Sequence, residues 1–195
     1  MRKIKRENSG KLRAGQDLVV AGTAGLAGSM IIAELKRQEL LQWFTTEYLD
    51  RLSAAEPVVD SGPKAHLEFW EPFGAMECEP AGEGGILAAI WNLSGAYETG
   101  VSFSLRLIPV RQETIEICER FELNPYRLYS DGCYLLAAEN GGQMVQTLEE
   151  NQIPAKVIGK VNRGIAREMK IQDDWGYLER PQPDELRKII PGFRV

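Results

Sequence analysis

The sequence is poor in the residues from which metal centres and redox sites are built. Its 195 residues include three cysteines, Cys78, Cys118 and Cys133, and one histidine, His66. The cysteines lie far apart and form no Cys-x-x-Cys pair, and an odd number does not make a disulfide framework. The sequence therefore excludes a zinc site built from several His or Cys ligands. We expect the three thiols to be buried core residues in a reducing compartment.

Basic residues are not in excess. Lysine and arginine total 23 and aspartate and glutamate 28, which gives a net charge of −5 and an isoelectric point near 5.1. A protein that binds a duplex needs excess Lys and Arg to displace counterions from phosphate. We therefore expect no nucleic-acid partner.

No stretch is long and apolar enough to span a membrane. The longest uncharged run covers residues 18–33 and contains glycine, serine and threonine, whereas a span needs about 20 mostly apolar residues. Basic residues precede this run, as in a signal peptide, but Asp17 lies at its edge and no clear cleavage site follows. The sequence therefore predicts a cytoplasmic protein that does not insert into a membrane.

The length fits a single domain, since domains average about 150 residues and a chain of this size buries about 70% of its unfolded surface. Residues 1–16 are basic and polar, and we expect this leader to be flexible. Residues 17–195 are expected to form one domain.

Hydrophobic patterning predicts an α+β fold with a mixed β-sheet flanked by helices. Strands are expected at 17–22, 101–107, 132–138 and 155–161, and helices after Ser29 and at 47–54, 86–98, 113–121, 143–150 and 184–190. Residues 56–63 and 71–85 are rich in Gly, Pro and acidic residues and are expected to be loops. Residues 64–70 suit a helix or a strand. The charged tail after Gly164 is expected to be a solvated face that ends in the last helix.

Two glycine-rich turns are candidate ligand sites. Gly22, Gly25 and Gly28 lie between a strand and a helix, where free amides favour a phosphate. Their spacing departs from Gly-x-Gly-x-x-Gly, and no Gly-Lys-Ser/Thr follows. A closely packed turn is the favoured interpretation, and a phosphate cradle at Gly22 and Gly25 is the alternative.

The second turn contains Gly82, Glu83, Gly84 and Gly85 and opens the most apolar helix. Its backbone could approach an anion closely. Acidic residues precede it, and Mg²⁺ is often held by one or two carboxylates together with phosphates. A phosphate and Mg²⁺ site, with Glu79 and Glu83 as metal ligands, and a plain acidic loop both remain open.

Taken together, these motifs resemble the C-terminal domain of the aminoimidazole-ribonucleotide (AIR) synthetase superfamily. That superfamily includes a hydrogenase-maturation dehydratase, selenophosphate synthetase and thiamine-monophosphate kinase. Residues 12–34 resemble the start of that domain, and residues 83–93 resemble its Glu-Gly-Gly helix start. Similar runs follow at 108–125, 130–137, 153–159 and 177–181, so the resemblance covers residues 12–190.

The chain departs from the family pattern in three ways. Only sixteen residues precede the domain-like region, whereas family members carry an N-terminal domain that supplies most ATP and Mg²⁺ ligands. The family loop has the pattern Asp-x-Thr-x-Gly-Gly. When this chain is aligned on Gly84-Gly85, Pro80 stands in place of the Asp and Gly82 in place of the Thr. A shift of the alignment by one residue would place Glu79 at the Asp position. The chain ends in Val195, without the terminal Cys of the hydrogenase-maturation branch.

The resemblance and its departures imply a stand-alone C-terminal-type domain that is not catalytic by itself. We expect it to bind a phosphate-bearing ligand or a partner chain at Gly82–Ile86, and to form a homodimer or to pair with a separate N-terminal-type domain. The alternative is one half of a split ATP-dependent synthetase or kinase, or a factor for metalloenzyme (hydrogenase) maturation. ATP and Mg²⁺ would then bind only with the partner domain, at Gly82, Gly84 and Gly85 and at Glu79 or Glu83.

Overall fold

The computed structural model describes residues 11–55 and 66–193. They form one seven-stranded sheet in the order β2-β4-β1-β5-β3-β6-β7. The strands are β1 (Asp17–Ala21), β2 (Ala75–Pro80), β3 (Gly100–Ser104), β4 (Tyr134–Ala138), β5 (Ala155–Asn162), β6 (Arg167–Ile171) and β7 (Asp174–Tyr177). All neighbouring strands are antiparallel except β3 and β6, which are parallel. The sheet is therefore mixed, as predicted.

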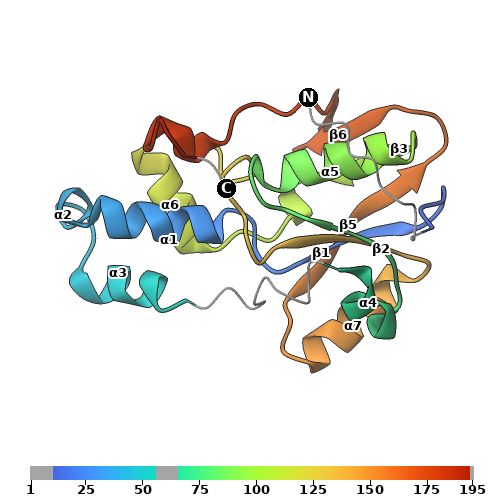
Figure 1. Ribbon diagram of the computed structural model, residues 1–195, viewed down its shortest axis with the longest axis horizontal. Helices are drawn as coiled ribbons and strands as arrows, with labels where there is room; N and C mark the ends of the chain where they lie inside the picture. Colours follow the sequence, from blue (N-terminus) through green and yellow to red (C-terminus); the bar gives the residue numbers. More distant parts are fainter. Residues whose placement is uncertain (1–10, 56–65, 194–195) are drawn as a thin grey trace.

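Helices cover both faces of the sheet and also gather at one end of it (Figure 1). They are α1 (Leu26–Leu35), α2 (Arg37–Leu40), α3 (Thr46–Ser53), α4 (Leu67–Trp70), α5 (Gly85–Ala96), α6 (Gln112–Arg120) and α7 (Gly141–Glu150), with 3₁₀ turns η2 (Glu71–Phe73), η3 (Leu105–Leu107) and η4 (Glu185–Lys188). The α+β prediction is confirmed. None of the helices that the structure describes could cross a lipid bilayer.

Alternation along β1 divides the core between the two faces of the sheet. Leu18 and Val20 pack with α5 on one face, while Val19 and Ala21 pack with α4 and α7 on the other. Successive strand residues point to opposite faces, so a continuous apolar run suits a strand that is buried on both. A third cluster joins α1, α3 and α6 to the C-terminal tail, and these elements lie together beside the sheet (Figure 1).

Most elements predicted from strong apolar patterns are present, with ends shifted by a few residues. The expected strand at 101–107 stops at Ser104, and residues 105–107 form the 3₁₀ turn η3. The expected helix at 143–150 begins at Gly141, because the side chain of Asn140 accepts a hydrogen bond from the Gln143 amide and caps it. Within residues 64–70, Leu67–Trp70 are helical.

Two expectations about irregular segments were wrong. The expected loop at 71–85 contains strand β2, and the charged tail after Gly164 contains the β6–β7 hairpin. Both lie at edges of the sheet. The side chains of β6 and β7 reach water, whereas those of β2 are mostly buried, including Glu77 and Glu79. Edge strands therefore tolerate charged residues and proline that hide a strand pattern.

Three parts of the chain named in the sequence analysis lie outside the described residues. They are residues 1–10 of the basic leader, the expected loop at 56–63, and Val195. Residues 11–16 are described and contact the body of the protein. The Leu12 side chain is buried, and the Lys11 amide donates a hydrogen bond to the Met76 carbonyl at 3.0 Å. The boundary between leader and domain at residue 16 remains a prediction.

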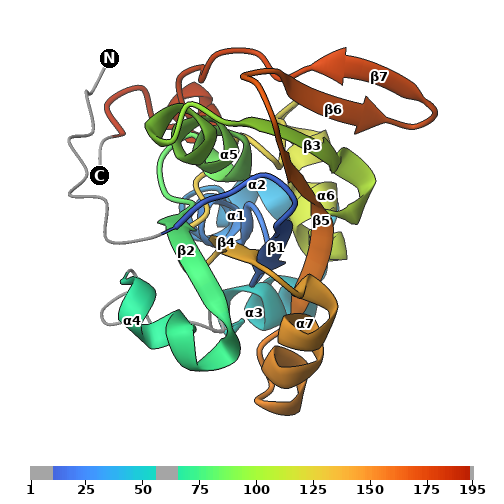
Figure 2. The same ribbon diagram turned by 90° about the vertical axis from the view of Figure 1, so that its right-hand side faces the viewer.

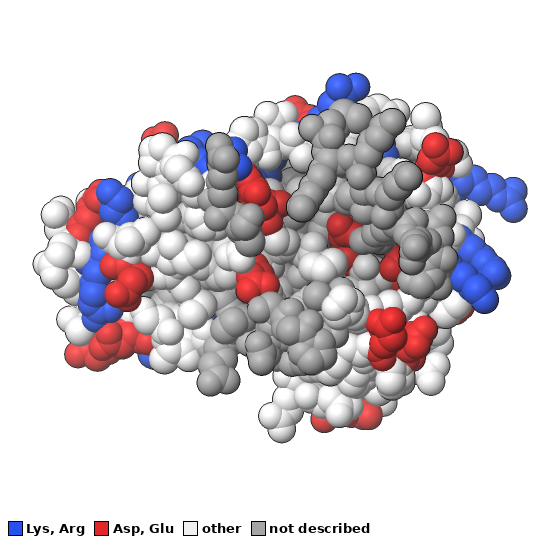
Figure 3. All heavy atoms as spheres, viewed as in Figure 1, with Lys and Arg blue, Asp and Glu red and all other residues white. Residues whose placement is uncertain are grey.

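Basic and acidic side chains lie among one another on the face shown in Figure 3. An acidic residue and a basic residue also fasten the start of β1, because Asp17 accepts hydrogen bonds from Lys160 Nζ at 2.7 Å and from the Gly141 amide at 2.9 Å. Burial raises the pKa of Asp17, but these bonds outweigh it and the net pKa lies below the ordinary value of 3.8.

Replacement of Asp17 by asparagine should therefore flatten the acid dependence of stability. A lowered carboxylate pKa contributes stability that is present above the unfolded value of 3.8 and is lost as the pH falls through the folded value. Urea unfolding between about pH 7 and pH 3 would measure the slope. The exposed residue Glu34 supplies a control, and Glu34→Gln should leave the slope nearly unchanged. An Asp17→Asn slope as steep as the wild type would contradict this assignment.

Candidate ligand-binding turn at the start of helix α5

The turn Gly82–Gly85 connects β2 to α5, and its glycines are required by backbone geometry. Gly84 and Gly85 have φ angles of 82° and 66°, which side-chain-bearing residues rarely adopt. A Cβ atom on Gly85 would lie 2.5 Å from the Tyr126 carbonyl oxygen and 2.8 Å from that of Leu128. The helix start therefore packs directly against the backbone of residues 126–128.

Gly82 differs from its neighbours, since a Cβ atom there would meet nothing within 4 Å. Its carbonyl oxygen accepts hydrogen bonds from the amides of Gly85 at 3.1 Å and Ser130 at 3.3 Å. Gly82 thus joins the turn to the loop before β4 through its backbone alone.

The carboxylate of Asp184 fills the turn. Its Oδ2 accepts a hydrogen bond from the Gly84 amide at 2.6 Å, and its Oδ1 accepts from the amides of Leu186 at 2.8 Å and Tyr129 at 3.2 Å. Only 2% of Asp184 is exposed. Burial raises the pKa of this carboxyl above its ordinary value, the three amides oppose that shift, and Glu83 adds to it. The amides that would face a bound anion therefore hold an anion of the chain itself.

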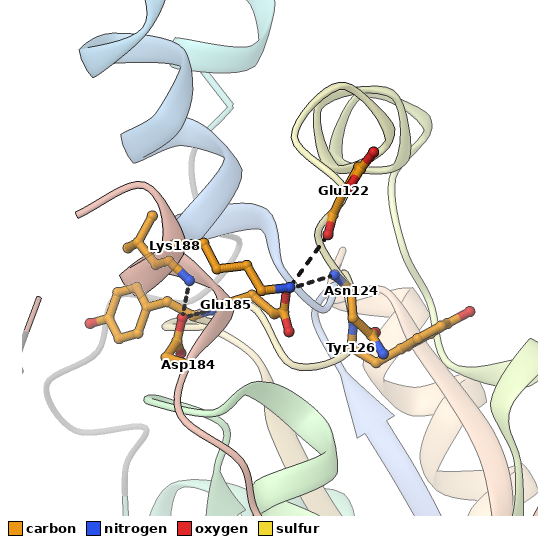
Figure 4. Close-up of polar contacts among 8 residues, drawn as sticks. Glu122, Asn124, Tyr126, Asp184, Glu185 and Lys188 are labelled. Atoms are coloured by element: carbon orange, nitrogen blue, oxygen red, sulfur yellow. Dashed lines mark hydrogen bonds and ion pairs between the residues drawn. The ribbon is translucent and has the colours of Figure 1, made fainter. Parts of the chain in front are cut away.

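Further contacts hold the tail over this site. We call residues 179–190 the C-terminal strap. Arg187 forms an ion pair with Glu83 of the turn. The Glu185 carboxylate accepts from the Asn124 amide at 3.2 Å and pairs with Lys188 at 2.6 Å, and Figure 4 shows these residues between the strap and the end of α6. The strap is thus fastened at Asp184 and by three residues that follow it.

Little space remains beside the turn. The cavity next to Gly84 has a volume of about 10 Å³ and is lined by Leu87, Ala88, Arg127, Arg180 and Gln182 among others. A space of this size holds one water molecule at most. In this conformation a phosphate could enter only if the strap moved.

The first glycine turn packs against the same loop. A Cβ atom on Gly22 would lie 2.5 Å from the Gly132 carbonyl oxygen, and one on Gly25 would lie 2.7 Å from that of Pro125. The Gly25 amide donates to Ser130 Oγ at 2.8 Å. These contacts support the packed-turn interpretation of Gly22 and Gly25, and a ligand role for them remains a prediction.

The structure brings both turns onto the loop 125–132, which sequence reasoning did not identify as a junction. Asp184 is the N-cap of η4, where it accepts from the Leu186 amide. Its bond to Gly84 spans 100 residues. A local pattern carries no information on such a contact.

The two candidate metal ligands differ in their surroundings. Glu79 is buried in β2, with 6% of its surface exposed, while Glu83 forms the ion pair with Arg187 at the surface. Within residues 11–55 and 66–193, no three His, Cys, Asp or Glu side chains gather in a way that could hold a metal ion. The residues described do not by themselves fit Mg²⁺, and metal binding by Glu79 and Glu83 remains a prediction that requires a partner.

All three cysteines are buried, as expected. Burial raises the pKa of both Cys118 and Cys133 to about 12, so the reactive thiolate is scarce at neutral pH. We predict that iodoacetamide at about pH 7.5 leaves both thiols unmodified in the folded protein and alkylates them in urea. Mass spectrometry would show this, and rapid labelling of native Cys133 would contradict it.

The fold has known counterparts among solved structures. Escherichia coli HypE, a hydrogenase maturation protein, matches with a TM-score of 0.67 and 20% identity over 92% of this chain and 54% of its own. HypE in a HypE–HypF complex matches with a TM-score of 0.62 and 17% identity over 87% and 54%. Thiamine-monophosphate kinase from Stenotrophomonas maltophilia K279a matches with a TM-score of 0.60 and 14% identity over 83% and 52%. No protein-family model and no curated protein sequence matches the chain.

The chain therefore has a fold found in the AIR synthase-like superfamily, and the resemblance seen in the sequence is confirmed at this level. It spans about half the length of these structures. At such low identity the likeness defines the fold alone.

Proposed function

We propose that this chain is an AIR-synthase-related, C-terminal-type domain that binds a partner and does not catalyse a reaction by itself. The observation that carries the proposal is the filled turn. Asp184 occupies the amides at the start of α5, so the place expected for a phosphate-bearing ligand is closed by the chain itself. A partner chain is thus favoured over a free small ligand.

The length of the structural relatives supports the same proposal. The chain aligns with 54% of E. coli HypE, and a protein of that kind occurs in a complex with HypF. By analogy, the partner of this chain is either a second copy or a separate N-terminal-type domain. We place the protein in the cytoplasm, in keeping with the expected reducing environment of its buried thiols.

A split ATP-dependent enzyme is the second candidate, including a kinase or a factor for hydrogenase maturation. This candidate is favoured by the structural relatives, which include a thiamine-monophosphate kinase and a hydrogenase maturation protein. In this case a partner would displace the strap and complete a phosphate site at Gly82, Gly84 and Gly85. Glu79 or Glu83 would help to hold Mg²⁺ there.

Nucleotide binding and turnover by the purified chain test the proposal. Isothermal titration with ATP and Mg²⁺, and a phosphate-release assay, should both show nothing for the chain alone. A ligand at about one hundred times its Kd would stabilise the fold by about 2.7 kcal/mol, so thermal unfolding provides a second measurement. ATP hydrolysis by the isolated chain would overturn the proposal, and turnover that appears only with a second chain would favour the split enzyme.

A further inference from the structure

The β6–β7 hairpin presents an unusual concentration of apolar surface. Of the eight large hydrophobic side chains exposed in the described part of the chain, three lie in it, namely Ile171 (44% exposed), Trp175 (61%) and Tyr177 (72%), and a fourth, Ile165 (72%), lies just before β6. Figure 2 shows the hairpin projecting from the body of the protein. A gathering of exposed apolar side chains on a projecting element is typical of an interaction site.

The backbone of β7 is also open to a partner. In the part of the chain that the structure describes, β7 is the last strand of the sheet and pairs with β6 alone. The Leu178 amide donates to the Arg167 carbonyl at 2.8 Å and so points towards β6. Because direction alternates along a strand, the amides and carbonyls of Trp175 and Tyr177 point to the open edge.

The side chains of Trp175 and Tyr177 lie on the face of the hairpin that the core does not use. Gly176 is opposite Met169 in the ladder, and Met169 packs against the core cluster around α5. The neighbours of Gly176 therefore point to the other face. A strand added to this edge would gain hydrogen bonds from the backbone and aromatic contacts beside it.

Charge identifies the partner strand. Asp173 and Asp174 lie at the start of β7, Arg180 lies just beyond its end, and all three are exposed. No ion pair is formed by any of them within the described residues. Antiparallel pairing centred on Tyr177 would place Asp174 of each copy opposite Arg180 of the other, with Asp173 beside it. The acid next to Arg180, Glu179, already pairs with Arg127 at 2.9 Å. Parallel pairing would place like charges together.

We propose that two copies of this chain associate through an antiparallel β7–β7 contact, which joins their sheets across a two-fold axis. The inference rests on the proposed function, because it names the partner of a partner-binding domain. With the axis perpendicular to the sheet, Trp175 and Tyr177 of both copies would line one continuous face. The negative start and positive end of each strand would set the direction.

Sedimentation of the full chain provides the first test. The wild type should be a dimer at roughly 100 μM, where a dimer with a Kd of about 1 μM is nearly complete. The double variant Trp175→Lys, Tyr177→Lys should be a monomer, since lysines on an edge strand oppose pairing. Leu35, which is 59% exposed on α1, provides the matched control, and Leu35→Lys should leave the dimer intact.

Charge reversal distinguishes this contact from non-specific association. Arg180→Glu alone, and Asp173→Arg with Asp174→Arg alone, should each weaken self-association by about tenfold or more. An equimolar mixture of the two variants should form a heterodimer, because every contact is again between opposite charges. This rescue also shows that both variants are folded.

Other outcomes would overturn the inference. They are a wild type that stays monomeric at roughly 100 μM, a dimer that survives Trp175→Lys with Tyr177→Lys, or a mixture of the charge variants that remains monomeric. None of these results would bear on the nucleotide experiments, so a failed interface and a failed proposed function are separable. A monomer that neither binds nor hydrolyses ATP would leave the non-catalytic role standing and remove only the β7 contact.

Discussion

Replacement of Gly85 by alanine is expected to destabilise the protein by roughly 3 kcal/mol or more. The new Cβ atom would lie 2.5 Å from the Tyr126 carbonyl oxygen, and the residue would keep a φ of 66°. The carbonyl oxygen and the φ angle both belong to the backbone, which cannot change rotamer to relieve the clash as a side chain can. Urea unfolding followed by circular dichroism would give the change in the free energy of unfolding.

Gly82, in the same turn, is the matched control. Nothing lies within 4 Å of its would-be Cβ atom, so Gly82→Ala should change stability by about 0.5 kcal/mol or less. Equal effects of the two variants would contradict the packing explanation. If Gly85 served only to admit a ligand, Gly85→Ala would leave the stability of the free chain unchanged.

The second large effect is expected from Asp184→Ala, which should cost about 3–5 kcal/mol. The variant leaves the amides of Gly84, Tyr129 and Leu186 without the carboxylate that now accepts from them, and each unpaired buried amide costs about 1–3 kcal/mol. Differential scanning calorimetry would record a lower Tm. The strap should also become sensitive to limited proteolysis, since Asp184 fastens it to the turn.

Two variants test that explanation. Asp184→Asn keeps one acceptor oxygen and should lose about half as much stability as Asp184→Ala. Among the residues that the structure describes, Asp131 accepts only from its neighbour, the Gly132 amide, so Asp131→Ala should cost about 1 kcal/mol or less. An Asp184→Ala protein as stable as the wild type would mean that the strap is held by its other contacts alone.

The pH dependence of the Asp184 contribution has a defined sign. Burial raises the pKa of this carboxyl above 3.8, so folding costs the charged carboxylate more than the protonated form. The contribution of Asp184 to the free energy of unfolding is fully present below pH 3.8, the unfolded pKa. It is lost as the pH rises through the pKa of the folded state. The stability difference between the wild type and Asp184→Asn should therefore be larger near pH 4 than near pH 7, which is opposite in sign to the effect expected for Asp17.

The elements that could be predicted from the sequence are those whose pattern is local. Strand β1 and helix α5 are continuous apolar runs because they are buried on nearly every side. Strand β2 was missed because Glu77, although buried, and Pro80 obscure its period. The β6–β7 hairpin was missed because its side chains reach water and charged residues such as Lys170 obscure its period.

The candidate site also has one part that the sequence predicts and one part that it does not. The glycine turns could be located from the sequence, since glycine is needed wherever the backbone turns sharply at a helix start. What fills the second turn could not be found, because Asp184 is 100 residues from Gly84 in the chain. Hydrogen bonds between such distant residues depend on the complete fold, and no local sequence pattern marks them.

The position of β1 has a consequence for biosynthesis. Its neighbours in the sheet are β4 and β5, so that Leu18 pairs with Ala137 and Gly159. During translation the amino-terminal strand leaves the ribosome long before either neighbour exists. Loop closure over such distances slows folding, and the nascent chain carries this apolar strand unpaired until β4 and β5 have been made. Shielding of β1 until β4 and β5 emerge would therefore favour correct pairing over aggregation.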